Sequence, residues 1–129
     1  MTEIDAVSSW RQAAADDWGV ATQLFESGKY AHCLFLVHLT LEKTLKGLHQ
    51  YLKHEPAPPL HDLYKLAKRS GIGVDDKLQN DLDEVTTFNI SARYDDYKRT
   101  FYHKATQAYA KIWFEKAKTI YLDFEQMFV

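Results

Sequence analysis

Apolar residues recur on one face of the segment from residue 30 to residue 52. They are Tyr30, Leu34, Val37, Leu41, Leu45, Leu48 and Leu52, and no proline interrupts them. Steps of three and four residues are the spacing of an amphipathic α-helix, because they return a side chain to the same face with every turn. The series therefore predicts a long helix whose apolar stripe faces a protein core.

The same periodicity predicts further helices on either side of this segment. The first is expected from Ile4 to Glu26, where Ser27-Gly28 ends it. Pro56-Ala57-Pro58-Pro59 ends the second helix, because proline restrains the residue before it and has no N–H to donate. A short third helix is expected from about His61 to Ser70, with Gly71 as its C-cap.

A fourth helix begins at Asp75 or Asp76, since either carboxylate suits an N-cap, and the last helix is expected from about Thr100 to Met127. Residues 88–98 lack a helical pattern and are expected to be irregular. The expected inward positions are Val7, Trp10, Ala14, Trp18 (or Asp17), Ala21, Phe25, Leu63, Leu66, Ala67, Leu78, Leu82, Val85, Ala105, Tyr109, Trp113 (or Ile112), Ala117, Ile120, Phe124 and Met127. Three long and two short helices around one core predict an all-α, antiparallel up-and-down helical bundle.

The composition indicates one globular domain over residues 1–129. Hydrophobic residues make up 46% and charged residues 26%, a balance that excludes a disordered chain. Five glycines and three prolines are too few for a repeated-hairpin β protein. A net charge of −2 argues against a domain that coats duplex nucleic acid, although a small basic pocket is compatible with it.

Cys33 is the single cysteine, so neither an intramolecular disulfide nor a cysteine-based zinc cluster is expected, and its apolar neighbours predict that it is buried. The N-terminus lacks the basic start and apolar run of a signal peptide, and no apolar stretch approaches the ~18 residues of a membrane span. A cytoplasmic protein without cofactor or metal is expected.

A polar row lies beside the apolar stripe of the second helix. His38, Glu42, Lys46 and His49 follow one another at steps of four, four and three residues, so they share a face. Glu42 and Lys46 can pair across one turn, with the glutamate N-terminal to the lysine as the helix dipole favours. The row is either a solvated flank with an ion pair worth ~0.3–0.5 kcal/mol, or part of a binding site.

Two features of the loops can bear chemistry. Arg93 and Tyr94 adjoin in Ala92-Arg93-Tyr94, where an arginine can grip a phosphate bidentately while the ring stacks on a base. The alternative is that Arg93 caps a helix or pairs with Asp95 or Asp96. His61 before the third helix is either a local hydrogen-bonding residue or a ligand-binding one.

The motifs occur in a particular order along the chain. Trp10 and Trp18 are followed by Gly28-Lys29-Tyr30, His38-Leu-Thr-Leu-Glu42-Lys43-Thr-Leu-Lys46, His61-Asp62-Leu63 and Ala92-Arg93-Tyr94. In this order and spacing the chain resembles the HEPN domain, a small helical family named for nucleotide binding in higher eukaryotes and prokaryotes. The resemblance covers about residues 8–125. It is greatest to the stand-alone prokaryotic members encoded beside minimal nucleotidyltransferases.

The resemblance implies one of two functions. Many HEPN domains are dimeric, metal-independent endoribonucleases, often toxins of toxin–antitoxin pairs, that use an Arg-X(4–6)-His motif. Here nine residues separate Arg93 from His103, and three separate Arg99 from His103, so the motif is not intact. Catalysis would need an atypical pair drawn from Arg93, Arg99 and His103. If the last helix begins early enough, Arg99 and His103 lie one turn apart on one face.

The other implied function is nucleotide or RNA binding. His38, Glu42 and Lys46 from the second helix, with His61, Arg93 and Tyr94 from the loops, would line a groove for a phosphate and a base. Burial of Arg93 against Glu42 for structure alone is the alternative. The resemblance also implies a homodimer and a minimal nucleotidyltransferase partner, whereas a purely structural helical adaptor is a third hypothesis.

Overall fold

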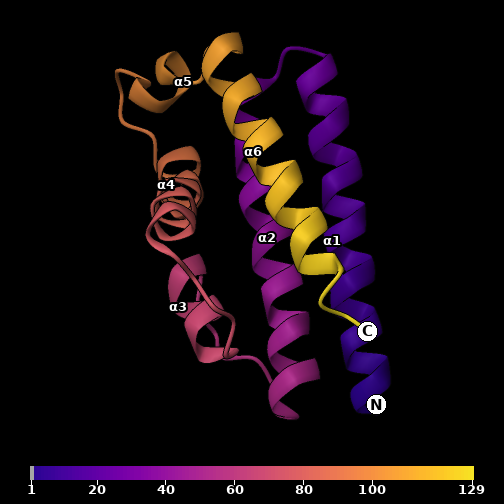
Figure 1. Cartoon of the computed structure of the whole chain (residues 1–129). Coiled ribbons are helices and arrows are strands. Elements are labelled where there is room, and N and C mark those ends of the chain that lie inside the picture. Colours follow the sequence, from indigo (N-terminus) through magenta and orange to yellow (C-terminus); the bar gives the residue numbers. More distant parts are fainter. Residues whose placement is uncertain (1) are drawn as a thin grey trace.

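A computed structural model describes residues 2–129 of the chain, and in these residues every regular element is a helix (Figure 1). The helices are α1 (Glu3–Glu26), α2 (Tyr30–Lys53), α3 (Leu63–Arg69), α4 (Asp76–Arg93), α5 (Thr100–Lys104) and α6 (Gln107–Glu125). The predicted all-α class is therefore confirmed. None of these helices is long and apolar enough to cross a membrane.

The helix α2 is the centre of the bundle, because each of the other helices contacts it. Figure 1 shows α1 and α6 beside α2 on one side, and α3 and α4 on the other. In Figure 1, α1 and α2 run in opposite directions, α6 runs antiparallel to α1, and the two termini lie at the same end of the molecule. This central position explains the long stripe of the sequence, whose members from Leu34 to Leu48 are fully buried.

Side-chain caps fix where the helices begin. The side chains of Asp62, Asp75 and Thr106 each accept a hydrogen bond from a backbone N–H three residues further on, at the N-termini of α3, α4 and α6. Gly28 and Gly71 end α1 and α3 with φ angles of 77° and 84°, values that glycine adopts without a Cβ clash. The expected end of the first helix is thus confirmed, whereas the C-cap of α3 is Ser70 and Gly71 is the left-handed residue directly after it.

Two predicted boundaries are wrong. Residues 88–93 continue α4 as helix up to Arg93, because Phe88 and Asn89 are buried against the bundle and this packing outweighs the weak local pattern. The last helix is two helices, since the backbone leaves the helical path at Ala105 and Thr106 caps α6. Leu52 and Met127, at the ends of their stripes, are exposed.

The core is apolar and partly aromatic. Trp18 and Phe25 of α1 stack on Phe114 of α6 at centroid distances of 4.7 and 4.9 Å, which joins the two helices across the bundle. Cys33 is buried as predicted, and its burial raises the pKa of the thiol to about 12. A thiol with such a pKa stays protonated at neutral pH and acts as a small apolar side chain.

Candidate functional site

The polar row of α2 is buried and forms one end of a hydrogen-bonded cluster. Glu42 is 6% exposed, Lys46 9%, and His38 is fully buried. The segment after the proline break runs back over this part of α2 and places His61 against it. The sequence-predicted residues His38, Glu42, Lys46 and His61 therefore do meet in space.

Glu42 is the centre of the cluster. Its Oε1 atom is 2.7 Å from Nδ1 of His61, and its Oε2 atom accepts a hydrogen bond of 3.2 Å from Nζ of Lys46. A carboxylate only accepts hydrogen bonds, so Nδ1 of His61 carries the hydrogen. Nε2 of His61 is then the atom left for a ligand, accepting when the ring is neutral and donating when it is protonated.

His61 is the part of the cluster that reaches solvent. Its side chain is 59% exposed, whereas that of Glu42 is 7% exposed. Among residues 2–129 its Nε2 atom takes part in no hydrogen bond. A buried carboxylate thus orients an accessible imidazole, an arrangement that can bind an anion or move a proton.

His38 acts on His61 through the backbone. Its Nε2 atom donates a 2.9 Å hydrogen bond to the carbonyl oxygen of His61, and this bond holds the linker between α2 and α3, residues 54–62, on α2. Burial lowers the pKa of His38, so this ring is neutral at neutral pH. Its Nδ1 atom is buried and has no hydrogen-bond partner among the described residues.

Lys46 is enclosed between Glu42 and the first helix. Its Nζ atom lies 5.6 Å from the centroid of the Trp10 ring, within cation–π range. One carboxylate and one ammonium balance each other in the buried part of the cluster. Protonation of His61 would therefore leave the cluster with one net positive charge at the surface, which suits a phosphate.

Arg93 and Tyr94 lie outside this cluster, at the end of α4. Both are exposed, and the guanidinium carbon of Arg93 lies 5.3 Å from the centroid of the Tyr94 ring. Because Glu42 is occupied by His61 and Lys46, the alternative of a buried Arg93–Glu42 pair is wrong. The segment after His61 touches α4 where the Leu63 N–H donates to Thr86 Oγ1 (3.1 Å). Arg93 lies two turns along α4 from Thr86, about 10 Å away on the same face.

Residues 93–104, named here the 93–104 tip, expose tyrosines beside cations. Tyr97 and Tyr102 are 90% and 49% exposed, and the cations of Lys98 and Arg99 lie 5.7 and 3.8 Å from the respective ring centroids. Asp95, by contrast, accepts hydrogen bonds from the backbone N–H groups of Phe101 and Tyr102 in α5. The tip therefore exposes aromatic rings with cations beside them.

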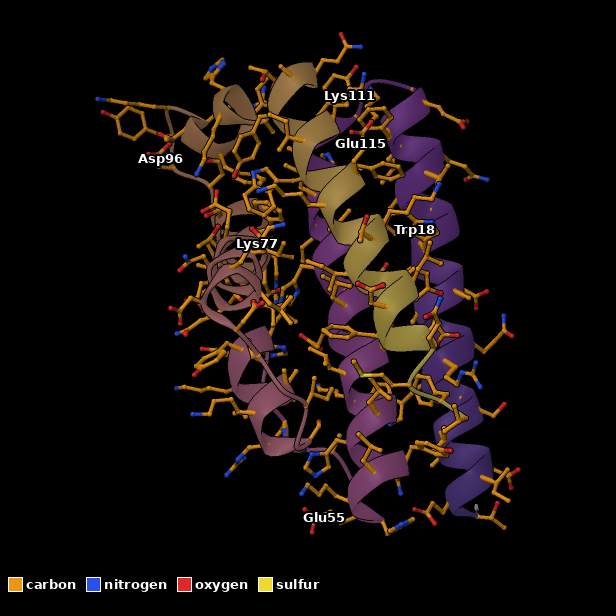
Figure 2. The ribbon with its side chains drawn as sticks, viewed as in Figure 1. Trp18, Glu55, Lys77, Asp96, Lys111 and Glu115 are labelled. Atoms are coloured by element: carbon orange, nitrogen blue, oxygen red, sulfur yellow. The ribbon has the colours of Figure 1, made fainter. Side chains whose placement is uncertain are left out.

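Asp96 is exposed, and Figure 2 shows it at the tip, where its carboxylate accepts hydrogen bonds from the backbone N–H and the hydroxyl of Thr100. Hydrogen bonds from Thr100 hold the pKa of the Asp96 carboxyl below its usual range, so it remains ionised. With both carboxylates of the tip used by α5, neither neutralises the exposed cations by a direct ion pair.

The three candidate catalytic residues all lie on exposed parts of this region. Arg99 has a left-handed backbone (φ 55°) at the N-cap of α5, and its carbonyl accepts the backbone N–H of His103. The guanidinium of Arg99 stacks on Tyr102, whose ring in turn meets the His103 ring edge-on at 5.5 Å. The hydrogen bonds of residues 2–129 include none between the side chains of Arg93, Arg99 and His103.

Fold and site together define an all-α bundle in which a buried ionic cluster supports one surface histidine. The model of the HEPN domain matches residues 7–127, nearly the whole chain, so this protein belongs to the HEPN domain family. The chain is also similar to TT1696 from Thermus thermophilus. That crystal structure matches with a TM-score of 0.79 at 22% identity, over 93% of this chain and 96% of that one. No curated protein matches the sequence.

Sequence reasoning missed one polar pair. His49, expected as the end of the polar row, is buried, and its Nε2 atom lies 3.1 Å from Oε1 of Glu55 in the linker. Glu55 stands directly before the proline run, where the sequence has no periodicity from which a partner can be read. Of the tyrosines in the 93–104 tip, Tyr94 was expected as a stacking residue, whereas Tyr97 and Tyr102 were missed because a single exposed tyrosine has no periodic signal.

Proposed function

We propose that this HEPN protein binds a nucleotide, or a short stretch of single-stranded RNA, with His61 as its phosphate-binding group. The observation that carries the proposal is the hydrogen bond between buried Glu42 and exposed His61, which orients the imidazole and leaves Nε2 to the ligand. Lys46 balances the charge of Glu42, so a protonated His61 offers an uncompensated positive charge to a phosphate.

The Arg93–Tyr94 pair supplies the second contact of the proposed site. An arginine with an exposed aromatic neighbour can hold a phosphate while the ring stacks on a base, and stacking tolerates any base. The separation of about 10 Å between Thr86, beside the linker, and Arg93 suits a ligand that has both a phosphate and a base. Further exposed tyrosines of the 93–104 tip extend this surface toward a longer single strand.

The proposal includes partners that the family resemblance implies. We propose a homodimer that acts with a minimal nucleotidyltransferase, as in a toxin–antitoxin-like pair. Sedimentation equilibrium at micromolar concentration is expected to give twice the mass of the chain. A monomer under these conditions would contradict the dimer.

RNA binding and cleavage by the purified protein in EDTA test the proposal. A labelled single-stranded oligoribonucleotide is expected to bind, as fluorescence anisotropy reports, and to remain intact. Arg93→Ala is expected to weaken binding by about tenfold, since a charge-assisted contact to phosphate is lost. Arg93 is exposed, so thermal unfolding of this variant should match that of the wild type.

The same assay distinguishes nucleotide or RNA binding from the alternative function, cleavage of RNA. Cleavage that leaves cyclic phosphate ends, and that is lost in Arg99→Ala or His103→Ala, would make the protein an endoribonuclease with an atypical Arg/His pair. Absence of both binding and cleavage in a folded protein would favour the structural adaptor.

A further inference from the structure

The linker between α2 and α3 is fastened to α2 at both ends by a histidine–carboxylate pair. At its end, His61 of the linker meets Glu42 of α2; at its start, Glu55 of the linker meets His49 of α2. His49 lies two turns beyond Glu42, about 10 Å along the helix. The pair at the start of the linker is thus separate from the site proposed above.

The His49–Glu55 pair borders a cavity of about 320 Å³. Its other lining residues are Pro56, Pro58 and Arg69. Neither the proline rings nor the Glu55 carboxylate can donate a hydrogen bond. The side-chain donors of the cavity are therefore the imidazole of His49 and the guanidinium of Arg69. Figure 2 shows Glu55 at the lower end of α2, far from Asp96 at the 93–104 tip.

The His49 side chain is built into the wall of this cavity. It is 5% exposed, and its Nδ1 atom has no hydrogen-bond partner among residues 2–129. Because Glu55 is a carboxylate, Nε2 of His49 is the donor of the 3.1 Å contact. A buried, fixed N–H group therefore already faces an anion.

The lining of the cavity holds one cation and one carboxylate, Arg69 and Glu55. The guanidinium of Arg69 is a bidentate donor, the geometry that suits a phosphate. Glu55 is the carboxylate of the lining and its side chain is 65% exposed. Because the Glu55 carboxylate is largely exposed to solvent, an external anion can compete with it for Nε2 of the buried His49.

We propose that this cavity is a second binding site, for a phosphate group that displaces the Glu55 carboxylate from His49 Nε2 and is held by the Arg69 guanidinium. Glu55 is the internal occupant of the site in the absence of ligand. The cavity volume lies at the lower end of the range of small-molecule sites, which suits a small oxyanion. The inference stands independently of the function proposed for His61.

An NMR titration of the full chain with inorganic phosphate tests the inference, with sodium chloride at matched ionic strength as the reference. The imidazole nitrogen signals of His49 and His61 are followed separately. His49 is expected to shift saturably. Glu55→Gln is expected to bind phosphate about fivefold more tightly, because the competing charge is removed while the side-chain volume is kept. Arg69→Gln is expected to bind about tenfold more weakly.

Glu115→Gln is the matched control, because Glu115 is exposed on α6 and Figure 2 shows it far from Glu55. It should bind phosphate as the wild type does. The inference is overturned if His49 does not respond to phosphate, or if Glu55→Gln leaves the affinity unchanged or weakens it. A response of His61 alone would overturn the phosphate site at His49 and would support the site proposed at His61. A response of His49 alone would support the site at His49 and count against phosphate binding at His61.

Discussion

His38 shows how a single buried histidine can position a surface residue. It lies wholly inside the bundle, and its Nε2–H holds the carbonyl oxygen of His61. The sequence predicted that His38 belongs to the site, but not that it acts through the backbone, because which atom a ring nitrogen meets depends on the path of the linker. The structure makes it a positioning residue.

Replacement of His38 tests this role through the pH dependence of stability. The folded state lowers the pKa of His38 through burial, while the unfolded chain protonates it near the ordinary value of 6.5. Below that pH the unfolded state binds more protons, so stability falls as the pH falls. We expect the free energy of unfolding of the wild type, relative to His38→Gln, to decrease from pH 7 to pH 5 by up to about 1.4 kcal/mol per pH unit.

Denaturant unfolding of both proteins across this pH range provides the measurement. Gln is chosen because its amide N–H can replace the Nε2 donor, whereas His38→Phe leaves the His61 carbonyl without a partner and should cost about 1–3 kcal/mol at pH 7. Equal pH profiles for the wild type and His38→Gln would show that His38 is not neutral in the folded state.

Glu42 and Lys46 form a buried ion pair whose two partners depend on each other. Glu42→Gln leaves the Lys46 ammonium without a counter-charge, and removal of one partner of such a pair costs about 3 kcal/mol. The double variant Glu42→Gln/Lys46→Met removes both charges and should recover part of this loss. Chemical denaturation of the single and double variants measures the free energy of unfolding of each. Additive losses of this free energy would mean that Glu42 and Lys46 are not energetically coupled.

At the scale of the elements, α1 and α2 show how far the sequence determines the fold. Both helices were predicted to within one residue at each end, because their apolar stripes are long and their ends are marked by glycine or proline. The part from Phe88 to Arg93 was missed, since tertiary packing of Phe88 and Asn89 rather than local pattern makes it helical. The break at Thr106 was missed because a threonine inside a helix and a threonine N-cap have the same sequence signal.

The contact between α1 and α2 can be tested with two glycines. Gly19 is exposed on α1 with open space where a Cβ would lie, so Gly19→Ala should stabilise the protein by about 0.5–1 kcal/mol. Gly47 is buried on α2, where a Cβ would lie 3.1 Å from Cβ of Trp10 and 3.3 Å from Phe128.

Gly47→Ala should therefore be less stable than Gly19→Ala by about 1–3 kcal/mol, because a rigid neighbour opposes the added methyl group. Thermal unfolding of the two variants provides the comparison. A Gly47→Ala protein as stable as Gly19→Ala would mean that the two helices lie further apart than described.

At the scale of the whole molecule, the bundle brings together groups from distant parts of the sequence. The order of the motifs indicated the family correctly, and the model of the HEPN domain confirms it over residues 7–127. The motifs did not predict that Glu42 orients His61, or that Glu55 meets His49, because both contacts depend on how the proline-containing linker returns over α2. A side-chain pair across a linker has no periodic signal.

The central claim is that His61, oriented by Glu42, binds the phosphate of a nucleotide. Isothermal titration calorimetry tests this claim most directly, with a 5′-mononucleotide titrated into the wild type, His61→Ala and His32→Ala. His32 is an exposed histidine on the same helix as Glu42, so its variant controls for the loss of an imidazole. We expect His61→Ala to weaken binding by about tenfold or more and His32→Ala to leave it unchanged. Equal affinities of a folded His61→Ala variant and the wild type would contradict the claim.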